Sequence, residues 1–184
     1  IYDQIQPARE GLYYAILAGS TSLTGRGLIL WRLPSVWIAM LSLAMTVTLM
    51  RRLLGVRISL MTLGLMSVAF WPVWMGRTVM HVTLMPLMIS TVLYTMTRAF
   101  QAHRQSVAGF WFAASGIMLG LAQYAHVTAW ILLVIPTGFI VYRMFINPAE
   151  VRRQWLNIFY TLILVIVTIL PLIIFLVRHP GTRE

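Results

Sequence analysis

The chain has 184 residues, of which 60% are hydrophobic and only 10% are charged. About a quarter of the residues in a soluble domain are normally charged, so this composition excludes an ordinary soluble domain and indicates a membrane protein. The net charge is +10, because 14 arginines are opposed by four acids, and the absence of cysteine excludes a disulfide framework and a thiolate metal site.

The first predicted element is a loop, residues 1–32, which we place on the outer face of the membrane. Within it, Gly11–Leu23 is apolar on one side and carries Ser, Thr and Tyr on the other. This stretch is too short and too polar to span a bilayer. We therefore expect a helix that lies in the membrane interface.

Six apolar stretches follow, and each approaches the ~20 residues that a helix needs to cross a hydrocarbon core about 30 Å thick. They predict an all-α fold, a polytopic transmembrane helical bundle over residues 33–177, followed by an outer-face tail, 178–184. Because the chain starts at Ile1 without a signal pattern and ends in a polar stub, we expect a fragment of a longer protein. The six predicted spans are Leu33–Met50, Ile58–Met75, Val79–Thr97, Val107–Tyr124, Val127–Phe145 and Trp155–Val177.

The arginines predict an orientation. Eight of the 14 fall in three loops, at 51–57, 98–106 and 143–154, which six alternating spans would bring to one side. Loops rich in arginine remain in the cytoplasm, so we expect a multi-pass protein of the cell (inner) membrane with these loops inside. The arginines punctuate apolar runs, which favours contact with membrane lipid head groups over binding of nucleic acid.

Small and cyclic residues predict details of packing. Pro72, Pro86, Pro136 and Pro171 lie inside predicted spans, where proline is tolerated and often kinks the helix. The stretch GIMLG, Gly116–Gly120, has the small-xxx-small spacing that allows helices to approach closely. We expect it to pack inside the bundle rather than to form a dimer.

Polar side chains gather near the predicted outer ends of the spans. Arg77 and His81 are four residues apart, which would place them on one helix face, and Tyr124 and His126 fall in an outer turn. No histidine pair has the i, i+4 spacing of a helical metal site, so no divalent metal is indicated.

Arg9 and Glu10 precede the aromatic residue Tyr13. They form either a surface ion pair or a site in which Arg9 binds a phosphate through its planar guanidinium group and Glu10 orients a neighbour.

Four stretches carry a family resemblance. PAREGLYYAILAGSTSLTGRGLILWRLPSVWIAML, WMGRTVMHVTLMPLMISTVLYTMTRAF, GIMLGLAQYAHVTAWILLVIP and ILPLIIFLVRHPG occur in this order and cover nearly the whole chain. Together they resemble glycosyltransferases of the GT-C fold that use lipid-linked sugars, bacterial relatives of protein O-mannosyltransferases and aminoarabinose transferases. Arg9, Glu10, Leu12 and Tyr13 match the first half of the family pattern, and Arg32–Ser35 match its Arg-Leu-Pro-Ser.

The resemblance implies a polyprenyl-phosphate sugar as donor, no other cofactor, and transfer on the outer face. It implies that Arg9 and Arg77 bind the phosphate and that Glu10 orients Arg9 or contacts the acceptor. Tyr13, Tyr124, His126 and His81 would line the cavity. The family's acidic motif follows an earlier span that this chain lacks, and a second acid is replaced near His81, so the principal catalytic acid is expected to be missing and the catalytic residues stay unassigned.

Two other functions remain open. A module without its catalytic acid could be a non-catalytic accessory or scaffold subunit that binds other subunits of a larger membrane complex. A transporter is disfavoured, because the sequence has no paired broken helices and no carboxylate inside a span.

Overall fold

The computed structural model describes residues 11–24, 28–77, 81–125 and 127–178. These ranges contain helices and no strand, which confirms the all-α prediction. The elements are α1 (Gly11–Thr24), α2 (Leu28–Leu54), α3 (Val56–Val68), α4 (Phe70–Arg77), η1 (His81–Thr83), α5 (Leu84–Gln101), α6 (Gln105–Ala122), η2 (Val127–Leu133), α7 (Val134–Ile146) and α8 (Pro148–Arg178).

Four helical stretches in the described ranges are long and apolar enough to cross a membrane: Leu30–Leu54, Gln105–Ala122, Ala129–Ile146 and Pro148–Phe175. They correspond to the first, fourth, fifth and sixth predicted spans and fit a multi-pass membrane protein. The second and third predicted spans differ from single long helices, and proline accounts for much of the difference.

The second predicted span is two helices, α3 and α4, separated by Ala69 in an extended conformation (φ −66°, ψ 135°). Pro72 is the third residue of α4. A proline has no N–H to donate to the carbonyl four residues earlier and its ring clashes with that carbonyl, which here belongs to Val68, the last residue of α3. With 13 residues, α3 is about 20 Å long and falls short of the hydrocarbon core.

A proline also stands in the first turn of two more helices. Pro86 is the third residue of α5, after the 3₁₀ turn η1, and Pro136 is the third residue of α7, after the 3₁₀ segment η2. In the first turn a proline costs little, because that N–H has no partner within the helix. Of the four prolines predicted to lie inside spans, Pro72, Pro86 and Pro136 therefore stand in the first turn of an α-helix, whereas Pro171 lies inside the continuous helix α8, where proline is tolerated.

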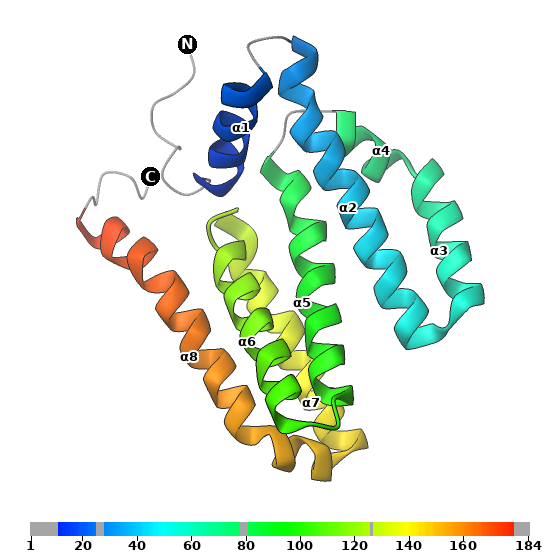
Figure 1. The fold of residues 1–184 in the computed structure, drawn as a ribbon, viewed down its shortest axis with the longest axis vertical. Coiled ribbons are helices and arrows are strands. Elements are labelled where there is room, and N and C mark those ends of the chain that lie inside the picture. Colours follow the sequence, from blue (N-terminus) through cyan, green and yellow to red (C-terminus); the bar gives the residue numbers. More distant parts are fainter. Residues whose placement is uncertain (1–10, 25–27, 78–80, 126, 179–184) are drawn as a thin grey trace.

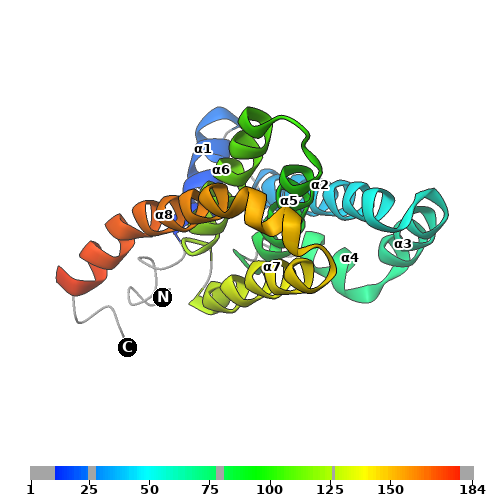
Figure 2. The same cartoon turned by 90° about the horizontal axis from the view of Figure 1, so that it is seen from below.

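The helices form a row in the order α3, α2, α5, α6, α8, with α7 on one side of the row and α1 on the other (Figures 1 and 2). The core surrounds α5, which packs between α2 and α6 and buries Leu84, Met88, Val92 and Met96. Because protein encloses α5 on both sides, this helix need not be as apolar as a helix that faces lipid.

The glycines of GIMLG pack inside the molecule, as predicted. A Cβ atom on Gly116 would lie 2.8 Å from the carbonyl oxygen of Thr161, and one on Gly120 would lie 2.5 Å from the Cβ of Thr168. Both glycines are buried against α8. The absence of side chains is what lets α6 and α8 approach this closely.

The three arginine-rich segments, 51–57, 98–106 and 143–154, lie at one end of the molecule, hereafter the arginine end, and α1 lies at the other, the α1 end (Figure 1). They were predicted to be loops, but most of their arginines lie in the ends of helices, since α2 runs to Leu54, α5 runs to Gln101 and α8 starts at Pro148. The turn between α2 and α3 depends on Gly55, whose φ of +89° suits glycine alone. Arg52 Nε donates to Gln101 Oε1 at 2.6 Å and joins α2 to α5, and Gln105 Nε2 donates to the Arg153 carbonyl at 3.0 Å and joins α6 to α8.

Candidate functional site

Two of the residues on which the family resemblance rests, Tyr13 and Ser35, contact each other in the structure. Tyr13 in α1 is 1% exposed, and its hydroxyl lies 2.7 Å from the Oγ of Ser35 in α2. Buried hydroxyls need a partner, and here each supplies the other. This polar contact between Tyr13 and Ser35 therefore joins α1 to α2.

Burial raises the pKa of the Tyr13 hydroxyl above its ordinary value near 10, against the opposing effect of the hydrogen bond with Ser35. A raised pKa in the folded state means that the contribution of this group to stability is complete below the unfolded pKa and is lost as the pH rises through the folded pKa. We expect Tyr13→Phe to lose less thermal stability than the wild type between about pH 8 and about pH 11, measured by tryptophan fluorescence in detergent. Equal losses would contradict a neutral Tyr13 held by burial.

Tyr124 joins three helices at the α1 end. Its hydroxyl donates to the Thr168 carbonyl in α8 at 2.8 Å, and its own carbonyl accepts from the Leu12 N–H in α1 at 3.3 Å. The turn after α6 therefore holds α1 and α8 in place. Tyr13 and Tyr124 were predicted to line a cavity, and the structure places both hydroxyls in contacts between helices.

Gln123 is a buried residue that the sequence analysis missed. Its Nε2 donates to the Ala129 carbonyl at 3.0 Å, whereas its Oε1 is buried without a donor among the described residues. An unmatched buried amide oxygen costs free energy, so it is a candidate acceptor for a water or a ligand hydroxyl. The sequence signal is a lone glutamine inside the apolar stretch GLAQYA.

Arg77 and His81 belong to different elements. Arg77 is exposed and ends α4, whereas His81 begins η1, so the prediction that they share a helix face is wrong. Arg9, Glu10 and His126 lie outside the described residues, and so does the side chain of His81. The roles predicted for these four residues stay predictions. No group of three potential metal-binding side chains occurs among the residues that the structure describes.

An apolar groove of about 220 Å³ opens among α2, α3, α4, η1 and α5. Ser42 and Thr83 are its only polar lining residues. Gly76 packs at its edge, since a Cβ there would lie 3.1 Å from the Cβ of Ala39, and Arg77 is the next residue along the chain. The lining is formed by Ala39, Ser42, Leu43, Met66, Pro72, Thr83 and Pro86.

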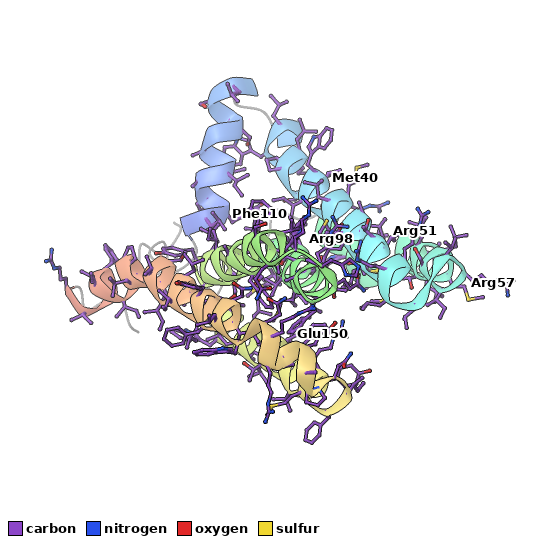
Figure 3. The ribbon with its side chains drawn as sticks, turned by 60° about the horizontal axis from the view of Figure 1, so that its bottom comes forward. Met40, Arg51, Arg57, Arg98, Phe110 and Glu150 are labelled. Atoms are coloured by element: carbon purple, nitrogen blue, oxygen red, sulfur yellow. The ribbon has the colours of Figure 1, made fainter. Side chains whose placement is uncertain are left out.

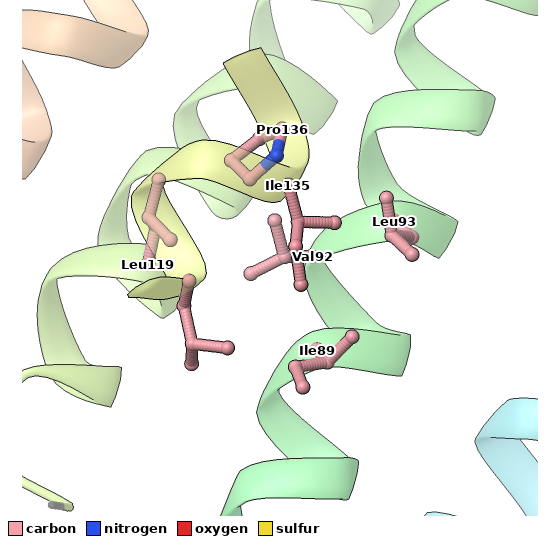
Figure 4. Close-up of a pocket in the computed structure, with 7 residues that line it drawn as sticks. Ile89, Val92, Leu93, Leu119, Ile135 and Pro136 are labelled. Carbon is pink, nitrogen blue, oxygen red and sulfur yellow. The ribbon is translucent and has the colours of Figure 1, made fainter. Parts of the chain in front are cut away.

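A second cavity lies deeper, between α5, α6 and the start of α7 (Figure 4). Its volume is about 10 Å³, which is at the lower limit for one water molecule, and its walls are aliphatic. It is a packing gap and not a ligand site. The groove beside Arg77 is the larger of these two spaces and the one that an extended apolar chain could enter.

Comparisons of the chain with family models, with curated proteins and with solved structures return no match.

Proposed function

We propose that the chain is part of an integral-membrane glycosyltransferase that moves a sugar from a polyprenyl-phosphate donor to an acceptor on the outer face. One observation carries the proposal: a mainly apolar groove adjoins the end of α4, where Gly76 packs against the lining residue Ala39 and the cationic residue Arg77 follows in the chain. A prenyl chain is apolar along its length and carries its phosphate at one end, so the groove and the arginine match its two parts.

The lining of the groove favours a hydrocarbon ligand. Pro72 and Pro86 contribute rings that carry no N–H of their own, and Ser42 and Thr83 are the two lining residues with a hydroxyl. A hydrocarbon chain gains dispersion contacts there without leaving a polar group unpaired. The phosphate would remain at the mouth, within reach of water and of Arg77.

The charge distribution supports an outer-face reaction. In the proposed six-span topology, the arginine end faces the cytoplasm of a cell (inner) membrane. The α1 end, where α4 ends and α5 begins, then faces outward (Figure 1). This orientation places Arg77 where a carrier would present its sugar to an acceptor outside.

The chemistry requires a leaving-group stabiliser and a base. The sugar–phosphate bond breaks as the acceptor oxygen attacks, and an arginine beside the departing phosphate stabilises its charge. The acceptor proton needs a base, and the only carboxylate in the described part of the chain, Glu150, lies at the arginine end. We therefore assign Arg77 to phosphate binding and assign no catalytic base.

Filling the groove tests this proposal. We expect Leu43→Trp, inside the groove, to weaken binding of a radiolabelled polyprenyl-phosphate sugar to the purified protein by about tenfold. Leu41→Trp is the matched control, because Leu41 lies on the same helix, is 52% exposed and does not line the groove. Equal affinities of the two variants for the donor, or no saturable binding of the donor to the wild type, would contradict the proposal and favour a scaffold subunit.

Removing the cation tests the phosphate contact. A hydrogen bond to a charged group contributes about 1.5–3 kcal/mol, so Arg77→Ala should weaken donor binding by about tenfold or more. Arg178→Ala removes an equal charge from the end of α8 and should leave the affinity within about twofold. Binding of the dephosphorylated polyprenol should not depend on Arg77, and such a dependence would contradict a contact with phosphate.

A further inference from the structure

The arginine end has far more positive charge than its own carboxylates can neutralise. Eight arginines lie in its three arginine-rich segments, and within the described residues Glu150 is the one acid. Arg143 Nη1 lies 3.4 Å from Glu150 Oε2. The guanidinium of Arg143 also stacks over Phe100, 5.5 Å from the ring centre. Glu150 therefore forms its ion pair with Arg143.

Arg152, two residues beyond Glu150, is exposed and pairs with no carboxylate in the described part of the chain. It lines an open groove of about 580 Å³ in the corner where α7 ends and α8 begins. The rest of the lining is mainly apolar: Met144, Phe145, Pro148, Ala149 and Val151.

The corner lies where an apolar surface meets the arginine end. Phe145 is 85% exposed, and Tyr142, Met144 and Ile146 on the same last turns of α7 are also exposed. Helix α8, which contains a candidate span, starts in the same corner, and its apolar stretch begins at Trp155, about one turn beyond Arg152. Exposed aromatic and apolar side chains beside arginines are typical of the boundary between hydrocarbon and head groups.

We propose that this corner groove binds an anionic phospholipid from the leaflet at the arginine end. The guanidinium of Arg152 pairs with the phosphate, for which its planar fork is suited. Phe145, Met144 and Pro148 contact the glycerol and the first methylene groups. Basic pockets between membrane helices bind anionic head groups in this way.

Charge alone would also attract nucleic acid, but the groove favours lipid. Its walls offer one cation and several hydrocarbon surfaces, and a polynucleotide has no hydrocarbon to place against Phe145. The proposal does not depend on the polyprenyl donor, because the corner groove and the groove beside Arg77 share no residue.

The test is a titration of the delipidated, detergent-solubilised protein with phosphatidylglycerol and with phosphatidylcholine, followed by native mass spectrometry. We expect tighter binding of phosphatidylglycerol, and a loss of about five- to tenfold of that affinity in Arg152→Gln. Arg57→Gln is the matched control, because it removes the same charge from the start of α3, away from Glu150 (Figure 3). It should change the affinity by less than about twofold.

A second variant distinguishes binding in the groove from attraction by the positive charge alone. Ala149→Trp fills the groove and retains Arg152, and Ala149 is exposed, so the fold should tolerate the larger side chain. We expect it to lose the preference for phosphatidylglycerol as Arg152→Gln does. Three results would each overturn the proposal: equal binding of the two lipids, equal losses in Arg152→Gln and Arg57→Gln, or displacement of the lipid by a short oligonucleotide.

Discussion

Gly120→Leu is expected to separate α6 from α8 and to destabilise the protein by about 3 kcal/mol. The Cβ of any larger residue at Gly120 would fall 2.5 Å from the Cβ of Thr168 and 2.7 Å from its Cγ2. Thr168 cannot move freely, because its Oγ1 donates to the Leu164 carbonyl and its own carbonyl accepts from Tyr124. The measurement is the thermal unfolding midpoint in detergent, compared with that of the wild type.

The matched control for this variant is Gly138→Leu. Gly138 lies in α7, and a Cβ added there would meet nothing within 4 Å. In Gly138→Leu the same side chain is therefore added where there is open space, and we expect the thermal unfolding midpoint to shift little. If both variants behave alike, close contact between α6 and α8 does not stabilise the bundle. If Gly120→Leu alone changes the oligomeric state, the glycines serve an interface between copies.

Tyr13→Ala is expected to cost about 4 kcal/mol and to detach α1 from the bundle. Tyr13 is 1% exposed and contributes to the core that contains Ile38 and Leu84, so its removal leaves a cavity. It also leaves the hydroxyl of Ser35 buried without its partner. Limited proteolysis within Gly11–Thr24 should become faster in the variant, because the helix loses its main anchor.

Tyr14→Ala provides the comparison for that result. Tyr14 is the next residue, is 49% exposed, and touches Tyr13 only through an edge-on ring contact at 6.0 Å. Its removal should cost less than about 1 kcal/mol. A Tyr14 variant as unstable as the Tyr13 variant would show that α1 is held by general contact with detergent or lipid and not by the Tyr13–Ser35 pair.

Hydropathy predicted the long helices well. The apolar runs that became α2, α6 and α8 were located from composition, because each long helix satisfies its own backbone hydrogen bonds and needs only apolar side chains outside. The breaks at Pro72, Pro86 and Pro136 were missed because a hydropathy window sums side chains and ignores backbone donors. Proline position alone would not have located these breaks, because Pro34 and Pro171 lie inside the continuous helices α2 and α8.

The central position of α5 could not be read from the sequence. Its Thr95 and Thr97 are buried and bond to carbonyls of their own helix, Thr91 and Leu93 among them. Such a helix looks less apolar than one that faces lipid, although protein encloses it more completely. Helix neighbours depend on packing between distant segments, which local composition does not encode.

The candidate site was predictable in part. The motif residues Tyr13 and Ser35 were identified from the sequence, but only the fold shows that they bond to each other. Gln123 passed unnoticed, because the cost of its unmatched oxygen depends on burial and not on residue type. The groove beside Arg77 arises from the break between α3 and α4, which the sequence analysis did not predict.

The most direct test is sugar transfer itself. The full-length parent protein, of which we propose this chain to be a part, is reconstituted in vesicles with radiolabelled polyprenyl-phosphate sugars and an extract of outer-face acceptors, and the label that leaves the carrier is counted. We expect transfer by the wild type and by Leu41→Trp, and loss of transfer in Leu43→Trp and Arg77→Ala at an unchanged unfolding midpoint. No transfer from any donor, or transfer that is indifferent to Leu43 and Arg77, would contradict the account.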